Sequence, residues 1–234
     1  FNDLLLMMLE KIDPDSISTV ADVGCGVGMK TATMAKYFSN ATVSGFDFAV
    51  SAIEAARKAH QFANIQFSVE DITKAQNQKR YDLITAFDVL EHIEDWQGLV
   101  NSLIAVNNKM MMFSFPTGRM RPYEAKIGHF RNFKRNEVES FMSSLGYWTI
   151  KTFYAGFPFY SPIMRDFTNI FFKNYVEVTQ AEMGRASKLF HDIWYVLFRY
   201  GSSRTKGDNF IGLFEKISEK QDKTAGQGLD RGPD

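Results

Sequence analysis

Short apolar runs alternate with helix-like segments over the first half of the chain. Five runs have the length and the β-branched or aromatic content of buried strands, and they cover residues 19–23, 42–46, 65–69, 81–87 and 110–115. The segments between them carry apolar residues at helical spacing, as Ala52, Ile53, Ala56 and Ala59 do within 50–62. Strands that alternate with helices predict a parallel, doubly wound α/β sheet, whose ligands bind at the carboxyl ends of the strands.

The pattern changes after Pro116. Four segments follow in chain order: a basic segment punctuated by glycine and proline (116–135), a helix (135–145) and two strands (147–154 and 210–217). The insertion between these two strands, residues 155–208, is dense in aromatic side chains and helical in its second half. We therefore expect a single domain over residues 1–220. The tail over 221–234 is polar and glycine-rich, which predicts disorder.

The composition is that of an ordinary globular protein, but its charge is unevenly distributed. The 234 residues hold 27 Lys and Arg against 27 Asp and Glu and are 45% hydrophobic, which excludes a disordered chain, a collagen-like repeat and a coiled coil. Residues 1–98 hold 8 basic and 14 acidic side chains, whereas the remaining 136 residues hold 19 and 13. Such an asymmetry can indicate an anionic partner for the basic half.

The compartment is predicted from cysteine use and from the first residues. Cys25 is the one cysteine, so no internal disulfide forms and a reducing compartment is expected. The first residues lack the basic region and cleavage site of a signal peptide. The apolar run over 4–9 is much shorter than the roughly 20 residues that span a bilayer. We therefore expect a soluble, cytoplasmic protein.

A glycine-rich loop follows the first predicted strand and opens a helix. Gly24, Gly26 and Gly28 let the backbone turn sharply and approach a ligand closely, and the helix start offers unpaired N–H groups. Asp47 lies nineteen residues after Gly28, at the end of the second strand, where an acid can hold ribose hydroxyls. Together they predict a cofactor that contains a nucleoside.

The register of the loop disfavours nicotinamide dinucleotides. The dinucleotide fingerprint places its third glycine where this chain has Met29. Asp22, two residues before the first glycine, would repel a pyrophosphate but suits a cationic amino-acid group. A phosphate-binding loop that ends in Gly-Lys-Ser/Thr is absent as well.

Four motifs resemble those of class I S-adenosylmethionine-dependent methyltransferases. In chain order they are Asp22-Val23-Gly24-Cys25-Gly26-Val27-Gly28, Gly45-Phe46-Asp47-Phe48, Glu70-Asp71-Ile72, and Tyr81-Asp82-Leu83-Ile84 followed by Val89-Leu90-Glu91-His92. The last is similar to the subgroup of ubiquinone-biosynthesis O-methyltransferases and many natural-product and sugar methyltransferases. The resemblance covers residues 19–115, the cofactor-binding half. It implies a Rossmann-like sheet of seven strands with the last antiparallel, S-adenosylmethionine as cofactor and S-adenosylhomocysteine as product.

The resemblance also implies roles for individual residues. Those expected to bind the cofactor lie at or just after the ends of the first four strands: Asp22, Gly24, Cys25, Gly26, Gly28, Asp47, Phe48, Asp71, Ile72 and Phe87. The glycines would line the methionine portion beside Phe87, with Cys25 as a small loop residue and Asp22 fixing the amino group. Asp47 would accept hydrogen bonds from the ribose, and Phe48 would pack on the adenine. Asp71 would accept from the N6 amine, with Ile72 flanking the ring.

Candidate catalytic bases come from four histidines. His92 follows the fourth strand, where the family's acceptor site opens; substrate contact and a helix-start role are its alternatives. His129 lies in Gly128-His129-Phe130-Arg131-Asn132-Phe133, which resembles a stretch common in this subgroup. His60, at the end of the second helix, is expected at the surface away from the strand ends, and His191 is expected to be structural. Glu91 is expected to pair or cap locally rather than act as a base.

No cluster of His, Cys or carboxylate residues at metal-ligand spacing is visible along the chain. We therefore expect no bound metal and metal-independent transfer.

The basic segment and the insertion lie where the acceptor is expected to bind, and their residues suggest its chemistry. Residues 117–135 hold six cations and one acid. Arg119, Arg121 and Arg131 are candidates for binding a phosphate or carboxylate of the acceptor, and a solvated loop is the alternative. The aromatic residues within 157–200 fit a lid, a homodimer contact, or docking to a membrane or a lipid-like substrate. Nucleic acid is not expected, because no recognisable binding module accompanies the cations.

The sequence thus predicts an S-adenosylmethionine-dependent methyltransferase of a small-molecule acceptor, at oxygen rather than nitrogen. An anionic, lipid-linked or sugar acceptor fits the basic half, and docking of the insertion would add membrane association. The alternatives are a non-catalytic S-adenosylmethionine-binding protein and a methyltransferase of a macromolecule.

Overall fold

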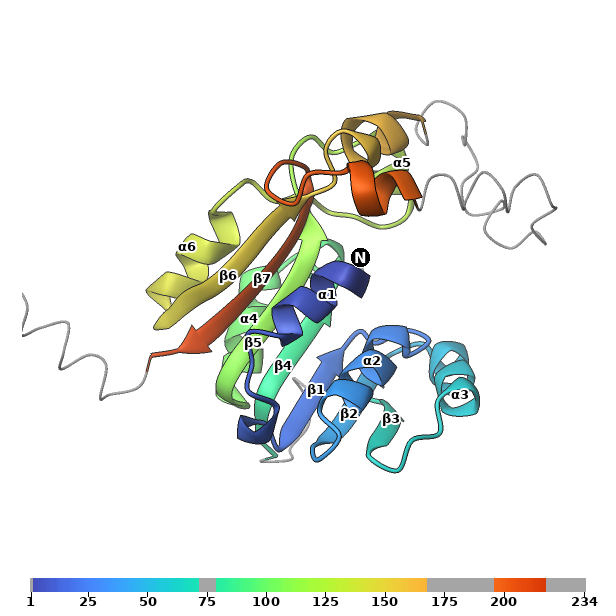
Figure 1. The fold of residues 1–234 in the computed structure, drawn as a ribbon, viewed down its shortest axis with the longest axis vertical. Coiled ribbons are helices and arrows are strands. Elements are labelled where there is room, and N and C mark those ends of the chain that lie inside the picture. The colour runs from blue at the N-terminus through green and yellow to red at the C-terminus, as the bar shows by residue number, and fades with distance from the viewer. Residues whose placement is uncertain (1, 72–78, 168–195, 218–234) are drawn as a thin grey trace, which may run out of the picture.

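The computed structural model describes residues 2–71, 79–167 and 196–217. Its centre is a seven-stranded sheet in the order β3-β2-β1-β4-β5-β7-β6 (Figure 1). The strands are β1 (Thr19–Val23), β2 (Thr42–Asp47), β3 (Ile65–Val69), β4 (Tyr81–Phe87), β5 (Asn107–Pro116), β6 (Tyr147–Ala155) and β7 (Asn209–Lys216). Strands β1 to β5 pair in parallel, and β7 pairs antiparallel with both β5 and β6. The predicted seven-stranded, doubly wound sheet with an antiparallel last strand is confirmed.

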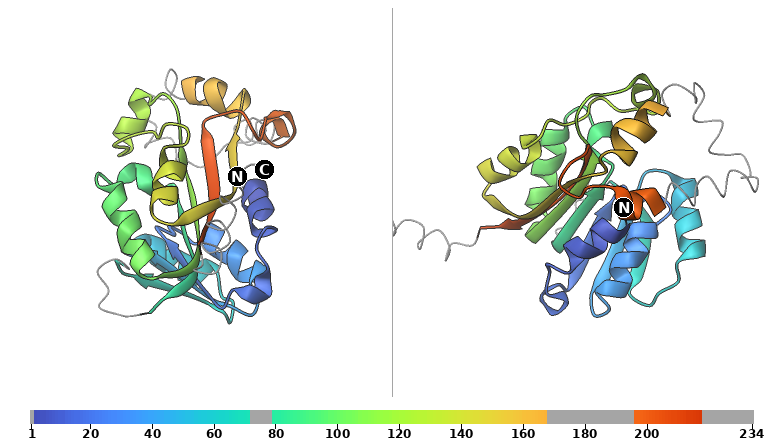
Figure 2. Two further views of the ribbon diagram at one scale, coloured as in Figure 1. Left: turned by 90° about the vertical axis from the view of Figure 1, so that its left-hand side faces the viewer. Right: turned by 45° about the horizontal axis from the view of Figure 1, so that its top comes forward.

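Helices cover both faces of this sheet (Figure 2). They are α1 (Asn2–Leu9), α2 (Met29–Tyr37), α3 (Val50–Ala59), α4 (Trp96–Ala105), α5 (Pro122–Lys126) and α6 (Glu137–Ser144). Met34 of α2 shares one apolar cluster with Leu83 of β4, whereas Trp96 of α4 shares another with Ile84. Because successive strand residues point to opposite faces, β4 is buried along its whole length, which explains its unbroken apolar run.

The strand order reverses between β1 and β4. From β1 the chain proceeds outward through β2 and β3, and from β4 it proceeds the other way through β5. Loops that leave the carboxyl ends of β1 and β4 therefore diverge and leave a crevice, which is where open α/β sheets bind ligands.

The second half differs from the prediction in its connections. The basic segment contains a short helix, α5, which begins with Pro122 at a position where its missing N–H costs nothing. The described ends of the insertion form two short π-helical turns, η3 (Phe159–Met164) and η4 (Leu197–Gly201), which contact each other at the carboxyl end of the sheet (Figure 2).

Other predictions fall partly or wholly outside the described residues. The insertion's core, residues 168–195 with His191, and the tail from residue 218 are outside them. Among the described residues, no helix is both long and apolar enough to cross a bilayer.

Candidate functional site

The glycine loop leaves β1 and is tied to the end of β2. The N–H groups of Gly24 and Cys25 donate to the Phe46 carbonyl oxygen at 2.8 and 3.0 Å. Gly24 has φ +69°, and a Cβ there would collide with the Val89 side chain. Gly26 has φ +53°, and a Cβ there would meet open space. The loop therefore needs glycine both for its turns and for a free inner side.

Asp47 holds the same loop from the next strand. One of its carboxylate oxygens accepts from the Gly26 N–H at 2.8 Å, and the other accepts from the Ala49 N–H at 2.9 Å. Each oxygen keeps capacity for a second hydrogen bond, because a carboxylate offers about four lone-pair sites. The acid predicted from spacing thus lies directly against the glycine loop.

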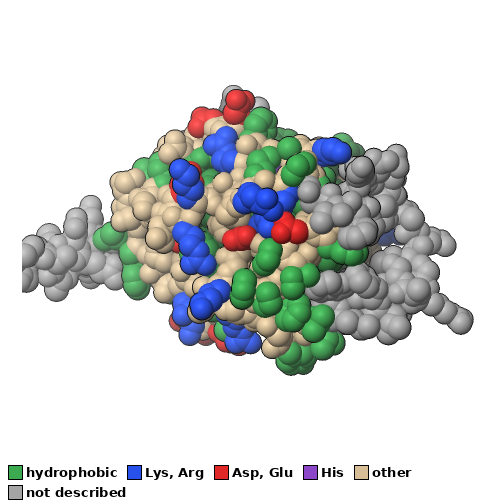
Figure 3. Space-filling model, turned by 90° about the horizontal axis from the view of Figure 1, so that it is seen from above, with side chains coloured by type: hydrophobic (Ala, Val, Ile, Leu, Met, Phe, Trp, Pro, Cys, Tyr) green, Lys and Arg blue, Asp and Glu red, His purple; other side chains and the backbone are tan. Residues whose placement is uncertain are grey.

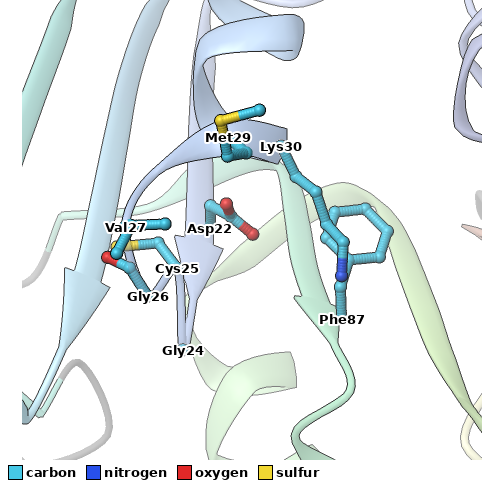
Figure 4. Close-up of a pocket in the computed structure, with 8 residues that line it drawn as sticks. All are labelled: Asp22, Gly24, Cys25, Gly26, Val27, Met29, Lys30 and Phe87. Carbon is cyan, nitrogen blue, oxygen red and sulfur yellow. The ribbon is translucent and has the colours of Figure 1, made fainter. Parts of the chain in front are cut away.

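Asp22 lies beneath the loop, at the wall of a cavity of about 270 Å³ (Figure 4). Its side chain is 1% exposed and accepts from the hydroxyls of Thr31 at 2.6 Å and Thr85 at 2.7 Å. Burial raises the pKa of this carboxyl, and the two hydroxyl contacts oppose that shift. Phe87 lines the same cavity at the end of β4, as predicted from its position.

Cys25 also lines this cavity, and its thiol is held in the protonated form. Burial, followed by the nearby charges of Asp22 and Asp47, raises the pKa of Cys25 to about 12. Since the thiolate is the reactive form, this cysteine has no nucleophilic role at neutral pH.

A second cavity of about 560 Å³ adjoins the first, since Gly24 lines both. Asp47, Phe48 and Asp71 line it, and the Phe48 side chain is 69% exposed beside it. The structure thus brings together the predicted residues from the ends of β1, β2 and β3. Ile72 lies outside the described residues.

Two histidines meet at the rim of the second cavity. The rings of His92 and His129 are edge to face, with centroids 4.6 Å apart. His92 Nδ1 lies 3.1 Å from the Gly128 carbonyl oxygen, which can only accept, so Nδ1 carries the proton and Nε2 is left as an acceptor. Burial, and then the neighbouring His92, lowers the pKa of His129, so its imidazole is neutral at physiological pH.

Glu91 completes a three-residue cluster with this pair. It is buried, and one of its carboxyl oxygens has no hydrogen-bond partner. Burial, and then Asp88, raises the pKa of Glu91 to about 8. One ligand atom from each of Glu91, His92 and His129 lies within 4.8 Å of the others, which is close enough to hold a metal ion. The sequence did not reveal this group, because folding brings His129 to the other two.

The remaining predictions on histidines need one correction. His60 was expected away from the strand ends, but its Nε2 lies 3.2 Å from the Val27 carbonyl oxygen of the glycine loop. The reason is that α3 packs beside the loop, with Phe67 of β3 against both Gly28 and His60.

Part of the basic segment's charge is compensated by ion pairs with carboxylates of the insertion. Arg119 is 75% exposed and contacts Asp166 of the insertion at 3.1 Å, and Arg131 donates to the Glu94 carbonyl oxygen at 2.6 Å. Figure 3 shows basic side chains around a small acidic group at this end of the molecule. The segment's cations are therefore partly neutralised by carboxylates that the sequence places far away.

Two arginines are buried at this end: Arg165, which sequence reasoning missed, and Arg121, which was expected as a candidate for binding the acceptor. Arg165 of the insertion is 1% exposed and donates through Nε to Glu124 at 2.9 Å. Arg121 donates to Asp166 at 2.8 Å, and its N–H donates to Glu124 at 2.6 Å. Glu124 also accepts from Asn132 at 3.1 Å. This arginine network, Arg121, Glu124, Arg165 and Asp166, holds the insertion against the segment that carries His129.

Lys30 and Asp88 were also missed, although both lie at the cavities. The Lys30 ammonium is 2.8 Å from an Asp88 carboxylate oxygen and 5.1 Å from the centre of the Phe87 ring. Lys30 is the second residue of α2, and Asp88 directly follows β4 with φ +59°. A positive φ is uncommon for a non-glycine residue, and no pattern in the sequence predicted it for Asp88.

Comparison with known proteins assigns the class. Residues 14–186 match the sequence family described as methyltransferase domain. The chain therefore belongs to this family, a class of enzymes that use S-adenosylmethionine, and the resemblance read from the four motifs is confirmed.

Among curated relatives, a malonyl-[acyl-carrier protein] O-methyltransferase of Acetivibrio thermocellus is 32% identical over 99 residues, which cover 42% of this chain and 35% of the relative. A ubiquinone biosynthesis O-methyltransferase of Vibrio parahaemolyticus is 36% identical over 104 residues, which cover 42% of this chain and 43% of the relative. The match thus spans less than half the length of each relative.

Two solved structures share the fold. Magnesium protoporphyrin IX methyltransferase of Synechocystis with bound S-adenosylhomocysteine is 16% identical, with a TM-score of 0.58 over 92% of this chain and 81% of its own. Haemonchus contortus phosphoethanolamine N-methyltransferase 2, in complex with phosphomonomethylethanolamine and S-adenosylhomocysteine, is 15% identical, with a TM-score of 0.62 over 92% of this chain and 53% of its own.

Proposed function

We propose that this chain transfers the methyl group of S-adenosylmethionine to a small-molecule acceptor, at oxygen rather than nitrogen. The observation that carries the proposal is the pair of adjoining cavities, with the glycine loop and Asp47 on one side and the two histidines on the rim.

The cofactor would lie across both cavities. The inner side of the loop at Gly26 leaves room for the methionine chain, and Asp22 supplies negative charge for its ammonium. Asp47 would accept from the ribose hydroxyls with its remaining lone pairs. Phe48 and Asp71, which line the larger cavity, would hold the adenine.

The chemistry is an in-line displacement at the methyl carbon. The acceptor oxygen forms a bond to this carbon while the carbon–sulfur bond breaks, and the electron pair stays on sulfur as S-adenosylhomocysteine leaves. Positioning supplies most of the acceleration in such a reaction. The acceptor hydroxyl also loses a proton, which the neutral imidazole of His129 or Nε2 of His92 would take. A neutral amine needs no such base before attack, so the histidine pair favours an oxygen acceptor.

The basic segment offers fewer cations to an anionic acceptor than its composition indicated. Arg119 is already paired with Asp166, whereas the Nε of Arg131 is buried without a hydrogen-bond partner. Arg131 is also two residues from His129. We therefore favour Arg131 for contact with a phosphate or carboxylate of the acceptor. Membrane docking, a lid role and dimer contact of the insertion depend largely on residues outside the described ranges.

Calorimetry with three ligands tests the proposal. We expect S-adenosylmethionine and S-adenosylhomocysteine to bind and NAD to show no binding. Failure of both sulfur nucleosides to bind would refute it. A screen of hydroxylated anions, followed by release of S-adenosylhomocysteine, then identifies the acceptor and separates an enzyme from a binding protein.

Chelation tests the role of the cluster at Glu91. Its raised pKa leaves Glu91 protonated and uncharged at neutral pH without a metal ion. We expect transfer to continue after dialysis against EDTA. Loss of transfer that a divalent ion restores would instead identify Glu91, His92 and His129 as metal ligands.

A further inference from the structure

Three charged side chains meet around the smaller cavity. Asp22 and Lys30 line its wall with Phe87 (Figure 4). Asp88, which directly follows β4, lies 2.8 Å from the Lys30 ammonium. The Lys30 side chain is 25% exposed, and it runs from α2 towards the Phe87 ring rather than into bulk solvent. Its ammonium also acts on the buried Asp22 carboxylate electrostatically. One carboxylate and one ammonium thus line the smaller cavity, and a second carboxylate, Asp88, lines the adjoining larger cavity and contacts the same ammonium.

This set of charges is the complement of the amino-acid end of S-adenosylmethionine. That end carries an ammonium, a carboxylate and a sulfonium, and therefore two positive charges and one negative. The two cationic groups match Asp22 and Asp88. The ligand carboxylate needs a cation, because the nearby Asp22 carboxylate repels it. A buried anion is also costly unless it is paired.

The geometry points to Lys30 as the residue that binds the α-carboxylate of S-adenosylmethionine. This inference rests on the proposed function and adds a residue that the motifs do not assign. Lys30 would exchange its ion pair with Asp88 for one with the ligand, which a flexible four-carbon stem allows without backbone movement. Asp88 would then face the cationic part of the ligand.

If Lys30 binds the carboxylate, the site distinguishes adenosine-containing ligands that carry this carboxylate from those that lack it. A ligand without the carboxylate keeps its contacts with Asp47 and Phe48 but loses the contact with Lys30. Decarboxylated S-adenosylmethionine is the matched probe, because it keeps the sulfonium and the ammonium and lacks only the carboxylate.

The test measures the dissociation constants of both ligands by calorimetry for the wild type and three variants. Lys30→Met removes the charge and keeps the length of the side chain, and Lys30→Arg keeps the charge. Lys36→Met is the matched control, since Lys36 lies on the same helix, is exposed, and is 5.3 Å from the Phe62 ring rather than at the cavity. Circular dichroism confirms that each variant folds.

We expect Lys30→Met to weaken S-adenosylmethionine binding about tenfold or more, as for the loss of one charged hydrogen bond, and to leave the decarboxylated ligand unaffected or tighter. Lys30→Arg and Lys36→Met should bind both ligands nearly as the wild type does. Equal weakening of both ligands by Lys30→Met, or no weakening of either, would overturn the inference while leaving the proposed function intact. Failure of the wild type to bind S-adenosylmethionine would overturn both.

Discussion

The glycine loop and the histidine pair lie at the same edge of the sheet, but they are assembled by different kinds of contact. The loop joins two neighbouring strands, β1 and β2, through backbone hydrogen bonds and one carboxylate. The histidine rim joins the end of β4, the basic segment and the insertion through side chains. The cofactor side thus follows from strand order, whereas the acceptor side depends on pairs of side chains far apart in the sequence.

Replacement of His129 gives the largest expected effect on the acceptor side. His129→Gln would remove the proposed general base, so we expect kcat to fall about 10²- to 10⁴-fold. The dissociation constant of S-adenosylmethionine should stay unchanged, because His129 does not line either cavity. The measurement is S-adenosylhomocysteine release with the acceptor from the screen, and His60→Gln is the control. A variant that loses cofactor affinity as much as rate would contradict the separation of the two sides.

Loss of Arg165 tests the arginine network. Arg165→Met leaves the buried Glu124 carboxylate without its main partner, so we expect the free energy of unfolding to fall by about 3–5 kcal/mol. Arg119→Met removes an exposed partner of Asp166 and should change the free energy of unfolding by less than about 0.5 kcal/mol.

Urea denaturation measures both changes, and the double variant Arg165→Met, Glu124→Gln should recover part of the loss. If both arginine variants have equally small effects, the insertion is not held by this network.

Strain in the loop tests the cofactor side. Gly24→Ala places a Cβ against Val89 at φ +69°, so we expect S-adenosylmethionine to bind about ten- to hundredfold more weakly. Gly146→Ala is a matched control, because Gly146 has φ +78° but no atom within 4 Å of the new Cβ. Both variants carry the strain of a positive φ, and Gly24→Ala alone should lose affinity in calorimetry. Normal binding by Gly24→Ala would place the cofactor elsewhere.

The pH dependence of transfer gives the smallest effect. The base form of His129 is the neutral imidazole, and its pKa lies below the usual 6.5. We therefore expect kcat to rise with pH through an apparent pKa below 6.5 and to be level at neutral pH. His92→Gln should move this limb to higher pH, because His92 lowers the pKa of His129. A limb that does not move in this variant would exclude coupling between the two rings.

The sequence predicted the cofactor side more completely than the acceptor side. Gly24, Asp47 and Phe48 were expected near one another because strand ends in a parallel sheet meet at one edge, and all three line the larger cavity. Lys30 escaped notice because a lysine at a helix start is ordinary, and its contact with Asp88 spans 58 residues. Glu91 was expected to pair or cap locally, because its burial beside two histidines has no signature in the sequence.

By itself the sequence determined the order of strands and helices, the glycine loop and the acid that follows it, since apolar periodicity and turn chemistry are local properties. Only the tertiary structure decided which charges are neutralised and which groups meet. Arg165 and Glu124 are 41 residues apart, and their pairing buries an arginine and a carboxylate together. The physical reason is that charge and pKa depend on burial and neighbours, and folding sets both of them.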